Sequence, residues 1–270
     1  MGTGARKKAM RNIPIDDIDD TPRPLVAIHT DYADGQVLPW HRHRRVQLLY
    51  GATGVMHVAT RAGNWVVPPG QAVWIPAEEA HQVRMLGVST HSLYLEPDAV
   101  IRPPPVCQVV KVSPLLCQLL AEAVKLPLLY DLDGRDGILA DLVFHELARL
   151  SSLPFHIPLP GDERLQKVCR AFLDEPDIHA RIDHWLPHLA MSERTFSRLF
   201  KQQTGLSFLR WKQQACVVLA LERLTAGESI TRIALEYGYD SPASFSTMFR
   251  RRFGQPPSHY RPDRPGHRPD

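Results

Sequence analysis

The chain has 270 residues, of which 44% are hydrophobic and 23% charged, and its formal net charge is +3 at pH 7. This composition is typical of a soluble globular protein, and the length is sufficient for two domains with separate cores. No stretch approaches the roughly 20 consecutive apolar residues of a transmembrane helix, so the sequence argues against a membrane protein.

Two features indicate a cytoplasmic protein. Residues 1–22 contain basic residues but no apolar run behind them, so we interpret them as a disordered tail and not as a signal peptide; residues 263–270 are expected to form a second tail. The four cysteines have apolar flanks, and none lies within metal-ligand spacing of another, which is typical of reduced, buried thiols. They are Cys107, Cys117, Cys169 and Cys216.

Residues 23–105 have the pattern of a small β-domain. Short runs of β-branched and aromatic residues alternate with Gly, Pro and Asn about every ten positions, and the prolines at 103–105 end the pattern. Such spacing is typical of an antiparallel barrel or sandwich.

Three histidines in this segment have the spacing of metal ligands. His41 and His43 are two residues apart, so on a strand their side chains share one face, while His81 arrives from a later strand. Three imidazoles with an oxygen from Gln47 would suit Zn, Ni, Fe, Mn or Cu. The neutral amide is a weaker ligand than a carboxylate, so we expect a looser and more positive site.

The same residues resemble the two cupin motifs. The first is carried by Gly35, His41, His43, Gln47 and Gly54, with Gln47 where metal-binding members usually have Glu; the second is carried by Gly70, Pro76, Glu78 and His81, with Glu78 in place of Gly. The resemblance implies a cupin-like effector or sensor barrel over residues 23–105.

Other interpretations of this segment stay open. Arg42, Arg44 and Arg45 flank the histidines and could form an anion-binding or effector-contacting patch. Gln47 and His81 could instead hydrogen-bond each other or the backbone in a partly buried pocket. Three tryptophans are expected to line an apolar effector pocket or to belong to the barrel core. They are Trp40, Trp65 and Trp74.

Residues 106–152 are predicted to form helices that serve as a linker or as a dimerisation region. Ser113-Pro114 and Asp136 are typical of helix starts. Two apolar stripes follow, and burial in a core and association of two subunits remain open because both use the same residues. The stripes comprise Leu115, Leu116, Leu119, Leu120, Ile138, Leu142, Val143, Leu147 and Leu150. The proline-rich residues 153–161 then form the expected domain boundary.

Residues 162–262 are predicted to be helical and to contain two helix-turn-helix units. In the first, Ser192 caps a helix whose inward residues are Phe196, Leu199 and Phe200. Pro187 lies inside the preceding helix, where we expect a kink, and Ala190 occupies the turn. The outward face at i, i+3, i+4 and i+7 carries Arg194, Ser197, Arg198 and Lys201.

The second unit has the same plan. A helix begins at Ser229, the chain reverses at Gly238, and Ser241-Pro242 starts a helix with Phe245 inward. This arrangement is the helix-turn-helix geometry, in which the second helix enters a major groove. The outward residues are Ala243, Ser246, Thr247 and Arg250.

The charge is concentrated in this part of the chain. Residues 192–261 contain eleven Lys and Arg against five Asp and Glu, so the rest of the chain is slightly acidic. A basic end on an acidic body indicates a polyanionic partner for that end only.

Residues 162–261 strongly resemble the DNA-binding domain of the AraC/XylS family of bacterial transcription regulators. The specific residues are Ser192, Arg194, Phe200, Gly205, Ala220, Ile233, Ala234, Gly238, Tyr239, Ser241, Phe245, Phe249, Phe253, Gly254, Pro257, Tyr260 and Arg261. The resemblance implies two recognition helices in neighbouring major grooves, about 34 Å apart. The residues on the two outward faces would then contact double-stranded DNA.

Three functions follow from these features. The first is a DNA-binding regulator, an activator or a repressor, whose affinity responds to a metal or small molecule in the cupin-like domain; it could also contact RNA polymerase. The second is a metal-dependent cupin enzyme, a dioxygenase or isomerase, and the third is an architectural DNA-binding protein with an inert barrel. The first uses both halves of the chain, so we expect a regulator and not an enzyme.

Overall fold

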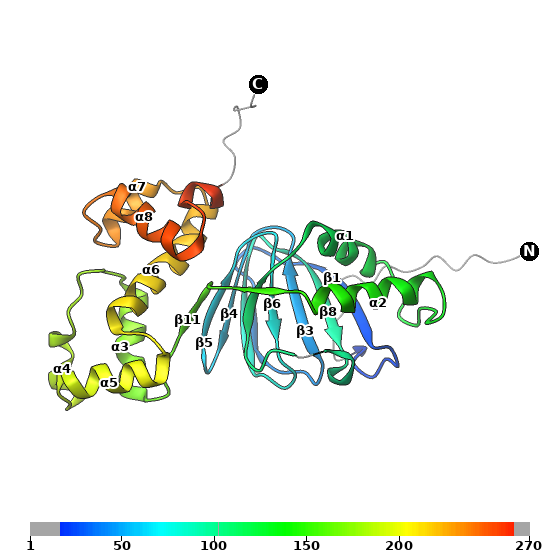
Figure 1. Cartoon of the computed structure of the whole chain (residues 1–270), viewed down its shortest axis with the longest axis horizontal. Helices are drawn as coiled ribbons and strands as arrows, with labels where there is room; N and C mark the ends of the chain where they lie inside the picture. Colours follow the sequence, from blue (N-terminus) through cyan, green and yellow to red (C-terminus); the bar gives the residue numbers. More distant parts are fainter. Residues whose placement is uncertain (1–16, 102, 262–270) are drawn as a thin grey trace, which may run out of the picture. The chain divides into compact units, whose positions relative to one another are not determined.

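The computed structural model describes residues 17–101 and 103–261 and divides the chain into two compact units (Figure 1). The first unit contains the chain up to Ala59 and Val67–Leu153; the second contains Thr60–Val66 and the chain from Pro154 onward. The division at Leu153 lies next to the proline-rich connection. Residues 60–66, which the sequence analysis placed in the barrel domain, group instead with the second unit.

The first unit contains a six-stranded antiparallel sheet and strands of a second sheet. The large sheet has the order β1 (Leu25–Asp31), β8 (Ser89–Leu95), β3 (Val46–Gly51), β6 (Gln71–Ile75), β9 (Gln108–Lys111) and β10 (Ser151–Leu153). In the second sheet, β4 (Val55–Thr60), β7 (His81–Leu86) and β2 (Val37–His41) are neighbours. The two-domain α+β class, with a cupin-like β-domain followed by an all-α domain, is therefore confirmed.

Two helices cover one face of the large sheet. Alternate strand residues such as Leu48 and Leu93 are fully buried against α1 (Pro114–Ala123) and α2 (Arg135–Leu147), which contribute Leu120 and Val143 to the same core (Figure 1). Each fully buried aliphatic side chain stabilises the fold by about 1.5–3 kcal/mol. Residues 106–152 are therefore part of the first unit, and the expectation of a separate helical linker is wrong.

The apolar stripes of these helices are divided between core and surface. Leu116, Leu120, Val143 and Leu147 are buried, whereas Leu115, Ile138 and Leu142 are 50%, 66% and 41% exposed. The core interpretation holds for the first set. The second set leaves an apolar surface, because three large side chains on two neighbouring helices face solvent.

Residues 17–22 do not belong to a disordered tail. Ile18 and Thr21 are buried, and Ile18 packs with Val26 and Ile28 of β1. The remaining residues assigned to the two tails, 1–16 and 263–270, lie outside the described part of the chain.

The second unit is mainly helical. It contains the strand pair β5 (Gly63–Val67) and β11 (His156–Pro158). The helices are α3 (Glu163–Asp174), α4 (Leu186–Leu189), α5 (Glu193–Thr204), α6 (Phe208–Thr225), α7 (Ile230–Glu236) and α8 (Pro242–Phe253), with 3-10 turns at Ile182–His184 and Pro257–Tyr260. No helix among the described residues is long and apolar enough to span a membrane.

Serine caps position the two helix-turn-helix units. The hydroxyls of Ser192, Ser207, Ser229 and Ser241 each accept a hydrogen bond from a first-turn backbone N–H. Each such cap contributes about 1 kcal/mol and defines where the helix begins. Gly238 makes the turn before α8 at φ 76°, where a Cβ would lie 2.3 Å from Asp177 Oδ1.

The turn of the first unit departs from our expectation. The helix before it, α4, is only four residues long, and Pro187 lies in its first turn, where no intrahelical donor is lost. The predicted kink inside a longer helix is therefore wrong, because the preceding segment is a separate 3-10 turn. Ala190 makes the turn in the left-handed conformation, at φ 50° and ψ 44°.

Candidate functional site

The three histidines of the first unit come together. His41 ends β2 and pairs across the strands with His81, the first residue of β7, while His43 follows β2. The rings of His41 and His43 lie 4.2 and 5.2 Å from that of His81, and one ring nitrogen from each residue lies within 4.8 Å of the others. His43 and His81 are buried. The structure thus brings together the three histidines that the sequence selected, but His43 lies beyond the end of β2, so the expectation that His41 and His43 share a strand is wrong.

The backbone orients each of these rings. Their Nδ1 atoms lie 2.8, 2.6 and 2.8 Å from the carbonyl oxygens of Pro39, Arg45 and Glu79, in the order His41, His43, His81. A carbonyl only accepts, so Nδ1 carries the proton and Nε2 presents its lone pair. His81 Nε2 is buried and has no hydrogen-bond partner in the described chain. This is the arrangement that orients imidazoles toward a metal ion.

Burial keeps the imidazoles of His43 and His81 uncharged. The pKa of His81 is lowered to about 4, mainly by desolvation and to a smaller extent by the positive charge of a protonated His41 or His43. Desolvation also lowers the pKa of His43, against hydrogen bonds that raise it. A neutral imidazole is the form that binds a metal.

Gln47 completes the cluster. Its Oε1 lies 3.2 Å from His43 Nε2, and its Nε2 donates to the Tyr94 hydroxyl at 3.0 Å. In this arrangement two hydrogen-bond acceptors, His43 Nε2 and Gln47 Oε1, face each other. Two ligand atoms that each lie about 2.1 Å from one metal ion are about 3.0–3.4 Å apart. A cation bound between His43 and Gln47 would therefore fit their separation. If the amide is turned over, its nitrogen donates to His43 instead.

Tyr94 is a member of this cluster that the sequence analysis missed. It is the cross-strand partner of Gln47 in the β3–β8 pair. Residues that pair directly across two strands lie on the same face of the sheet. Tyr94 could therefore be assigned to the cluster only once the register of β3 against β8 was known.

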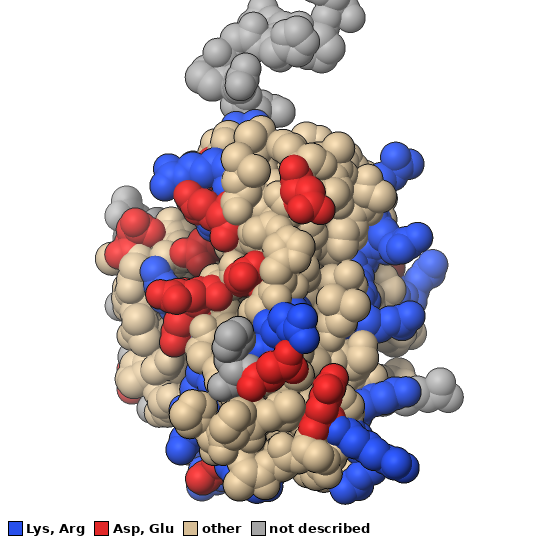
Figure 2. All heavy atoms as spheres, turned by 90° about the vertical axis from the view of Figure 1, so that its left-hand side faces the viewer, with Lys and Arg blue, Asp and Glu red and all other residues tan. Residues whose placement is uncertain are grey.

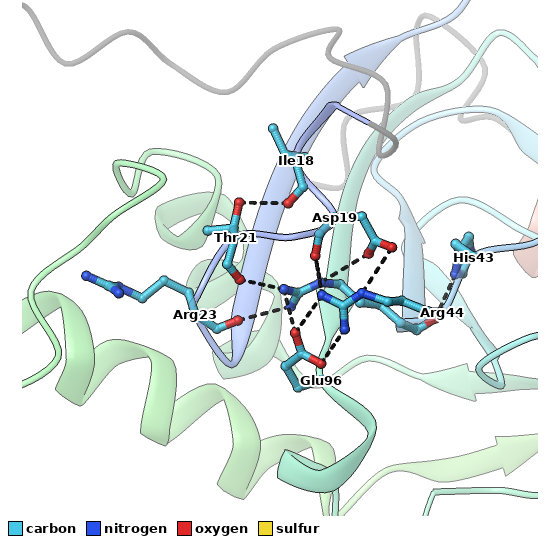
Figure 3. A network of polar contacts seen from close by, with 8 residues as sticks. Ile18, Asp19, Thr21, Arg23, His43, Arg44 and Glu96 are labelled. Carbon is cyan, nitrogen blue, oxygen red and sulfur yellow. Dashed lines mark hydrogen bonds and ion pairs between the residues drawn. The ribbon is translucent and has the colours of Figure 1, made fainter.

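The arginines that flank the histidines are already paired, so the anion-binding patch is wrong. Arg45 is fully buried and Arg44 partly buried, and both contact Asp19 and Glu96 (Figure 3). Arg45 also donates to the carbonyl oxygens of Asp19, Thr21 and Arg23. Arg42 lies 3.7 Å from Glu78. Because His43 donates to the Arg45 carbonyl, this network also supports the cluster.

Glu78 explains why the second cupin motif usually has glycine at this point. Its φ is 61°, in the left-handed region that a side chain disfavours. Its backbone N–H donates to the His43 carbonyl at 2.9 Å, so the turn joins the loops that carry His43 and His81.

The three tryptophans do not line one pocket. Trp40 is 53% exposed, Trp65 lies in the second unit and stacks on His156, and Trp74 is buried in the core under α1 and α2. Of the three, only Trp74 lines the cavity between the end of α2 and strands β6 and β9. The core interpretation therefore holds for Trp74.

In the second unit, the outward residues of the two helix-turn-helix units are accessible. On α5, the exposed residues are Arg194, Ser197, Arg198 and Lys201; on α8, Ala243, Thr247 and Arg250 are exposed and Ser246 is partly exposed. The inward residues Phe196, Phe200, Phe245 and Phe249 are fully buried. Both helices therefore turn the predicted faces outward.

The basic residues of these two faces have no acidic partner within the described chain. The side chains of Arg194, Arg198, Lys201 and Arg250 make no hydrogen bond or ion pair there. Elsewhere in the unit, Arg223 and Arg232 pair with Glu228 and Glu236. Figure 2 shows Lys and Arg gathered along one side of the view, whereas groups of Asp and Glu lie mainly over the middle and the opposite side. Unpaired cations are available to a polyanion without first breaking an ion pair.

A groove between α6 and α8 adds cations that the sequence analysis did not select. Its volume is about 640 Å³, and Ala243 and Thr247 line it beside Arg210, Arg251 and Arg252. Burial lowers the pKa of Arg252, and the neighbouring charge of Arg210 lowers it further. An anion in the groove would offset that repulsion. In the sequence, these cations could have been recognised from the three consecutive arginines at the end of α8, Arg250–Arg252.

Comparison with known proteins assigns both units. Residues 185–263 match the family described as helix-turn-helix domain, and residues 23–126 match the AraC-like ligand binding domain. The HTH-type transcriptional regulator NimR of Escherichia coli K12 is 31% identical over 223 residues, which cover 82% of this chain and 81% of NimR.

Two further proteins are similar over different parts of the chain. The arabinose operon regulatory protein of Salmonella typhimurium LT2 is 29% identical over 121 residues, 43% of this chain and 42% of that protein. A crystal structure of ToxT from Vibrio cholerae covers 88% of this chain and 96% of its own, with a TM-score of 0.37 and 11% identity.

Proposed function

This chain belongs to the AraC family of DNA-binding transcriptional regulators, and on that premise we propose that a metal or small molecule in its cupin-like domain modulates operator binding. One observation carries the DNA-binding part of the proposal. Four unpaired basic side chains occupy the outward faces of α5 and α8, each in the second helix of a helix-turn-helix unit.

The two helices differ in what they offer to DNA. Arg194 and Arg198 on α5 can each pair bidentately with a guanine, and Lys201 can hold a phosphate. Ala243, Ser246 and Thr247 on α8 offer methyl groups and hydroxyls, and Arg250 offers one cation. We therefore assign most base discrimination to α5, while α8 contacts the backbone and thymine methyls.

Binding to a selected DNA site tests this assignment. The operator is first selected from random duplexes with the full chain, and affinities of variants are then measured for that site and for scrambled DNA. Arg194→Ala and Arg198→Ala should each reduce discrimination by about 1–3 kcal/mol. The matched control is Arg181→Ala, because Arg181 is exposed in the same unit but pairs with Asp183 at 2.6 Å. Unchanged sequence preference in both α5 variants would refute the assignment.

For the cupin-like domain, we propose that His41, His43 and His81 hold a divalent transition metal, Zn, Ni, Fe or Mn, with Gln47 as an oxygen ligand. The supporting observation is the set of Nδ1–carbonyl hydrogen bonds that leaves three Nε2 lone pairs convergent. When bound, such an ion would act as a Lewis acid that receives a polar group of an effector. The chain's own residues orient the rings, exclude water from two of them, and hold the amide through Tyr94.

Metal analysis of protein purified without chelator or affinity tag tests this part. Mass spectrometry should find about one metal ion per chain in the wild type and a large loss in His41→Ala/His81→Ala. His145→Ala serves as the matched control, because His145 is exposed on α2 away from the cluster's strands. A metal-free wild type, including after incubation with each candidate ion, would overturn the metal assignment and leave the small-molecule alternative.

The histidine cluster is also the feature that supports the alternative function, a metal-dependent cupin enzyme. We assign it to ligand binding, because the matching relatives are transcriptional regulators and the helical unit has no role in an enzyme of that kind. Regulation then requires that ligand and DNA change each other's affinity by the same factor. DNA titrations with and without metal, and metal titrations with and without DNA, measure that reciprocity.

Self-association and contact with RNA polymerase are further parts of the proposal. The exposed side chains Leu115, Ile138 and Leu142 support a homodimer through α1 and α2. Sedimentation of the wild type and of Ile138→Glu measures the oligomeric state, and equal behaviour would argue against this surface.

A further inference from the structure

A turn in the helical unit, Asp177–Ala180, connects the two helix-turn-helix units. It lies between α3 and the 3-10 turn that precedes α4, so it leads directly into the first helix-turn-helix unit. The Ala180 N–H donates to the Asp177 carbonyl at 3.0 Å, and the His179 N–H donates to Oδ1 of the Asp177 carboxylate at 2.9 Å. The Asp177 side chain therefore helps to define the shape of the turn.

The same turn packs against the second helix-turn-helix unit. The Ile178 N–H donates at 3.0 Å to the carbonyl of Tyr237, the residue before the turn glycine Gly238. Asp177 lies so close to Gly238 that a Cβ on this glycine would meet the Asp177 Oδ1 at 2.3 Å. A residue that holds the Asp177–Ala180 turn in place therefore also holds the turn that precedes α8.

Lys212 holds this turn from α6, the helix between the two units. It lies in the first half of α6 and is only 6% exposed. Its Nζ donates to the carbonyl oxygens of Ile178 and Ala180 at 2.7 and 2.6 Å, and it lies 5.5 Å from the centre of the Phe208 ring. Burial of an amine is costly unless its N–H groups find acceptors, and both of these acceptors belong to the turn. The burial of Lys212 is therefore favourable only when the turn is in place.

These contacts join α5 and α8 by two routes. Along the chain, α5 is joined to α8 through α6 and α7. The second route runs from α4 back to the Asp177–Ala180 turn, and from there through Lys212 to α6 and through Tyr237 to the end of α7. Two bodies that are joined at two places cannot rotate freely about either connection. The relative placement of α5 and α8 therefore depends on the turn and on Lys212.

We infer that Lys212 is a positioning residue that fixes the separation and relative rotation of α5 and α8. Its consequence for DNA rests on the proposed function, in which both helices bind one duplex. One added base pair moves one contacted segment by about 3.4 Å along the duplex and rotates it by about 35°. A rigid pair of helices rejects this change, whereas a loosely joined pair follows it. Lys212 thereby determines which operator spacing the chain accepts.

Operators of altered spacing test this consequence in the full chain. In the selected operator, one base pair is inserted or deleted between the segments that α5 and α8 contact. Simultaneous binding of two linked sites raises affinity by about 10²–10⁴-fold, and the gain is lost when the geometry forbids both contacts. We expect the wild type to bind the altered operators about 100-fold more weakly, and Lys212→Met about tenfold more weakly or less. The ratio of the two affinities cancels any loss of folded protein, so a role of Lys212 in stability alone leaves that ratio unchanged.

Two further variants accompany Lys212→Met. Asp177→Ala removes the exposed carboxylate that shapes the turn and leaves the core intact, so this variant folds even if Lys212→Met does not. It should weaken the spacing preference in the same direction. Lys167→Met is the matched control, because Lys167 is exposed on α3 of the same unit, and it should keep the preference of the wild type.

A measurement without DNA separates this inference from the proposed function. Spin labels are attached at the exposed positions 202 on α5 and 251 on α8 through a ketone-bearing amino acid, which leaves the native cysteines unlabelled. Double electron–electron resonance on the full chain then measures the distance between the two helices. We expect one narrow distribution in the wild type and in Lys167→Met, and a broader or shifted distribution in Lys212→Met and Asp177→Ala.

Each outcome decides one of the two claims. Equal distance distributions in the wild type and Lys212→Met overturn the inference, and so does an unchanged spacing preference in Lys212→Met; where that variant does not fold, Asp177→Ala decides in its place. A narrow distribution that broadens in Lys212→Met, together with a wild type that shows no spacing preference, supports the positioning role. That combination overturns instead the proposed binding of both helices to one duplex.

Discussion

Ala190 offers the sharpest test of how the first helix-turn-helix is built. It ends α4 at φ 50° and ψ 44°, in the left-handed region. A side chain there crowds the following carbonyl oxygen and costs about 1–2 kcal/mol, a cost that glycine avoids. We therefore predict that Ala190→Gly stabilises the helical unit.

The expected size follows from two opposing effects. Relief of the left-handed strain gains about 1–2 kcal/mol, whereas the greater freedom of glycine in the unfolded chain loses about 0.5–1 kcal/mol. The net effect is a stabilisation of about 1 kcal/mol. Ala190 is exposed, so no change in packing complicates this comparison.

Ala226 provides a matched control of opposite sign. It is also exposed and also ends a helix, α6, but at φ −73° and ψ −1°, in the right-handed region. Ala226→Gly relieves no strain and only increases the entropy lost on folding. It should destabilise the unit by about 0.5–1 kcal/mol.

Hydrogen exchange in increasing urea measures both variants in the full chain. Peptides from α5 and α6 report the unfolding free energy of the helical unit separately from that of the first unit. If Ala190→Gly and Ala226→Gly shift this free energy by the same amount and in the same direction, the backbone conformation of Ala190 is not the source of strain.

Three further predictions concern charge. Glu96→Gln removes an acidic partner of the fully buried Arg45 and should destabilise the first unit by about 2 kcal/mol. Breaking a fully buried ion pair costs about 3–5 kcal/mol. The expected effect is smaller because the Glu96 side chain is 31% exposed. Burial lowers the pKa of His156, so the unfolded chain binds its proton more readily, and stability should fall as pH drops below about 6.5. His156→Gln should reduce that slope. Lys201→Gln should lower the slope of log affinity for DNA against log salt by about 0.9.

For each of these three predictions, one result would contradict it. Unchanged urea unfolding in Glu96→Gln would mean that Asp19 and the backbone carbonyls suffice for Arg45. Equal stability–pH slopes in the wild type and His156→Gln below about pH 6.5 would exclude His156 as a source of acid sensitivity. An unchanged salt slope in Lys201→Gln would place Lys201 away from the phosphates.

Local chemistry made much of the architecture predictable. Ser192, Ser229 and Ser241 cap helices where the sequence placed caps, because a cap depends on a hydroxyl and the backbone within three residues. The inward phenylalanines of α5 and α8 followed from the helical period. His41, His43 and His81 were selected by their spacing, although His43 lies beyond the end of β2 and strand alternation does not account for its position.

Errors arose where a residue depends on distant partners or on an exact element boundary. The arginine patch was wrong because Asp19 and Glu96, far from Arg44 and Arg45 in sequence, neutralise both. Pro187 was expected to kink a helix, but the boundary at Leu186 places it in a first turn.

The sequence by itself determined the two-unit plan, the outward faces of α5 and α8, and the histidines of the cluster, because periodicity and capping act over a few residues. Only the tertiary structure decided what those histidines face. The register of β3 against β8 placed Tyr94 on Gln47, and the packing of α2 on β6 and β9 left a cavity at Trp74. Such contacts join residues far apart in sequence, so no local pattern encodes them.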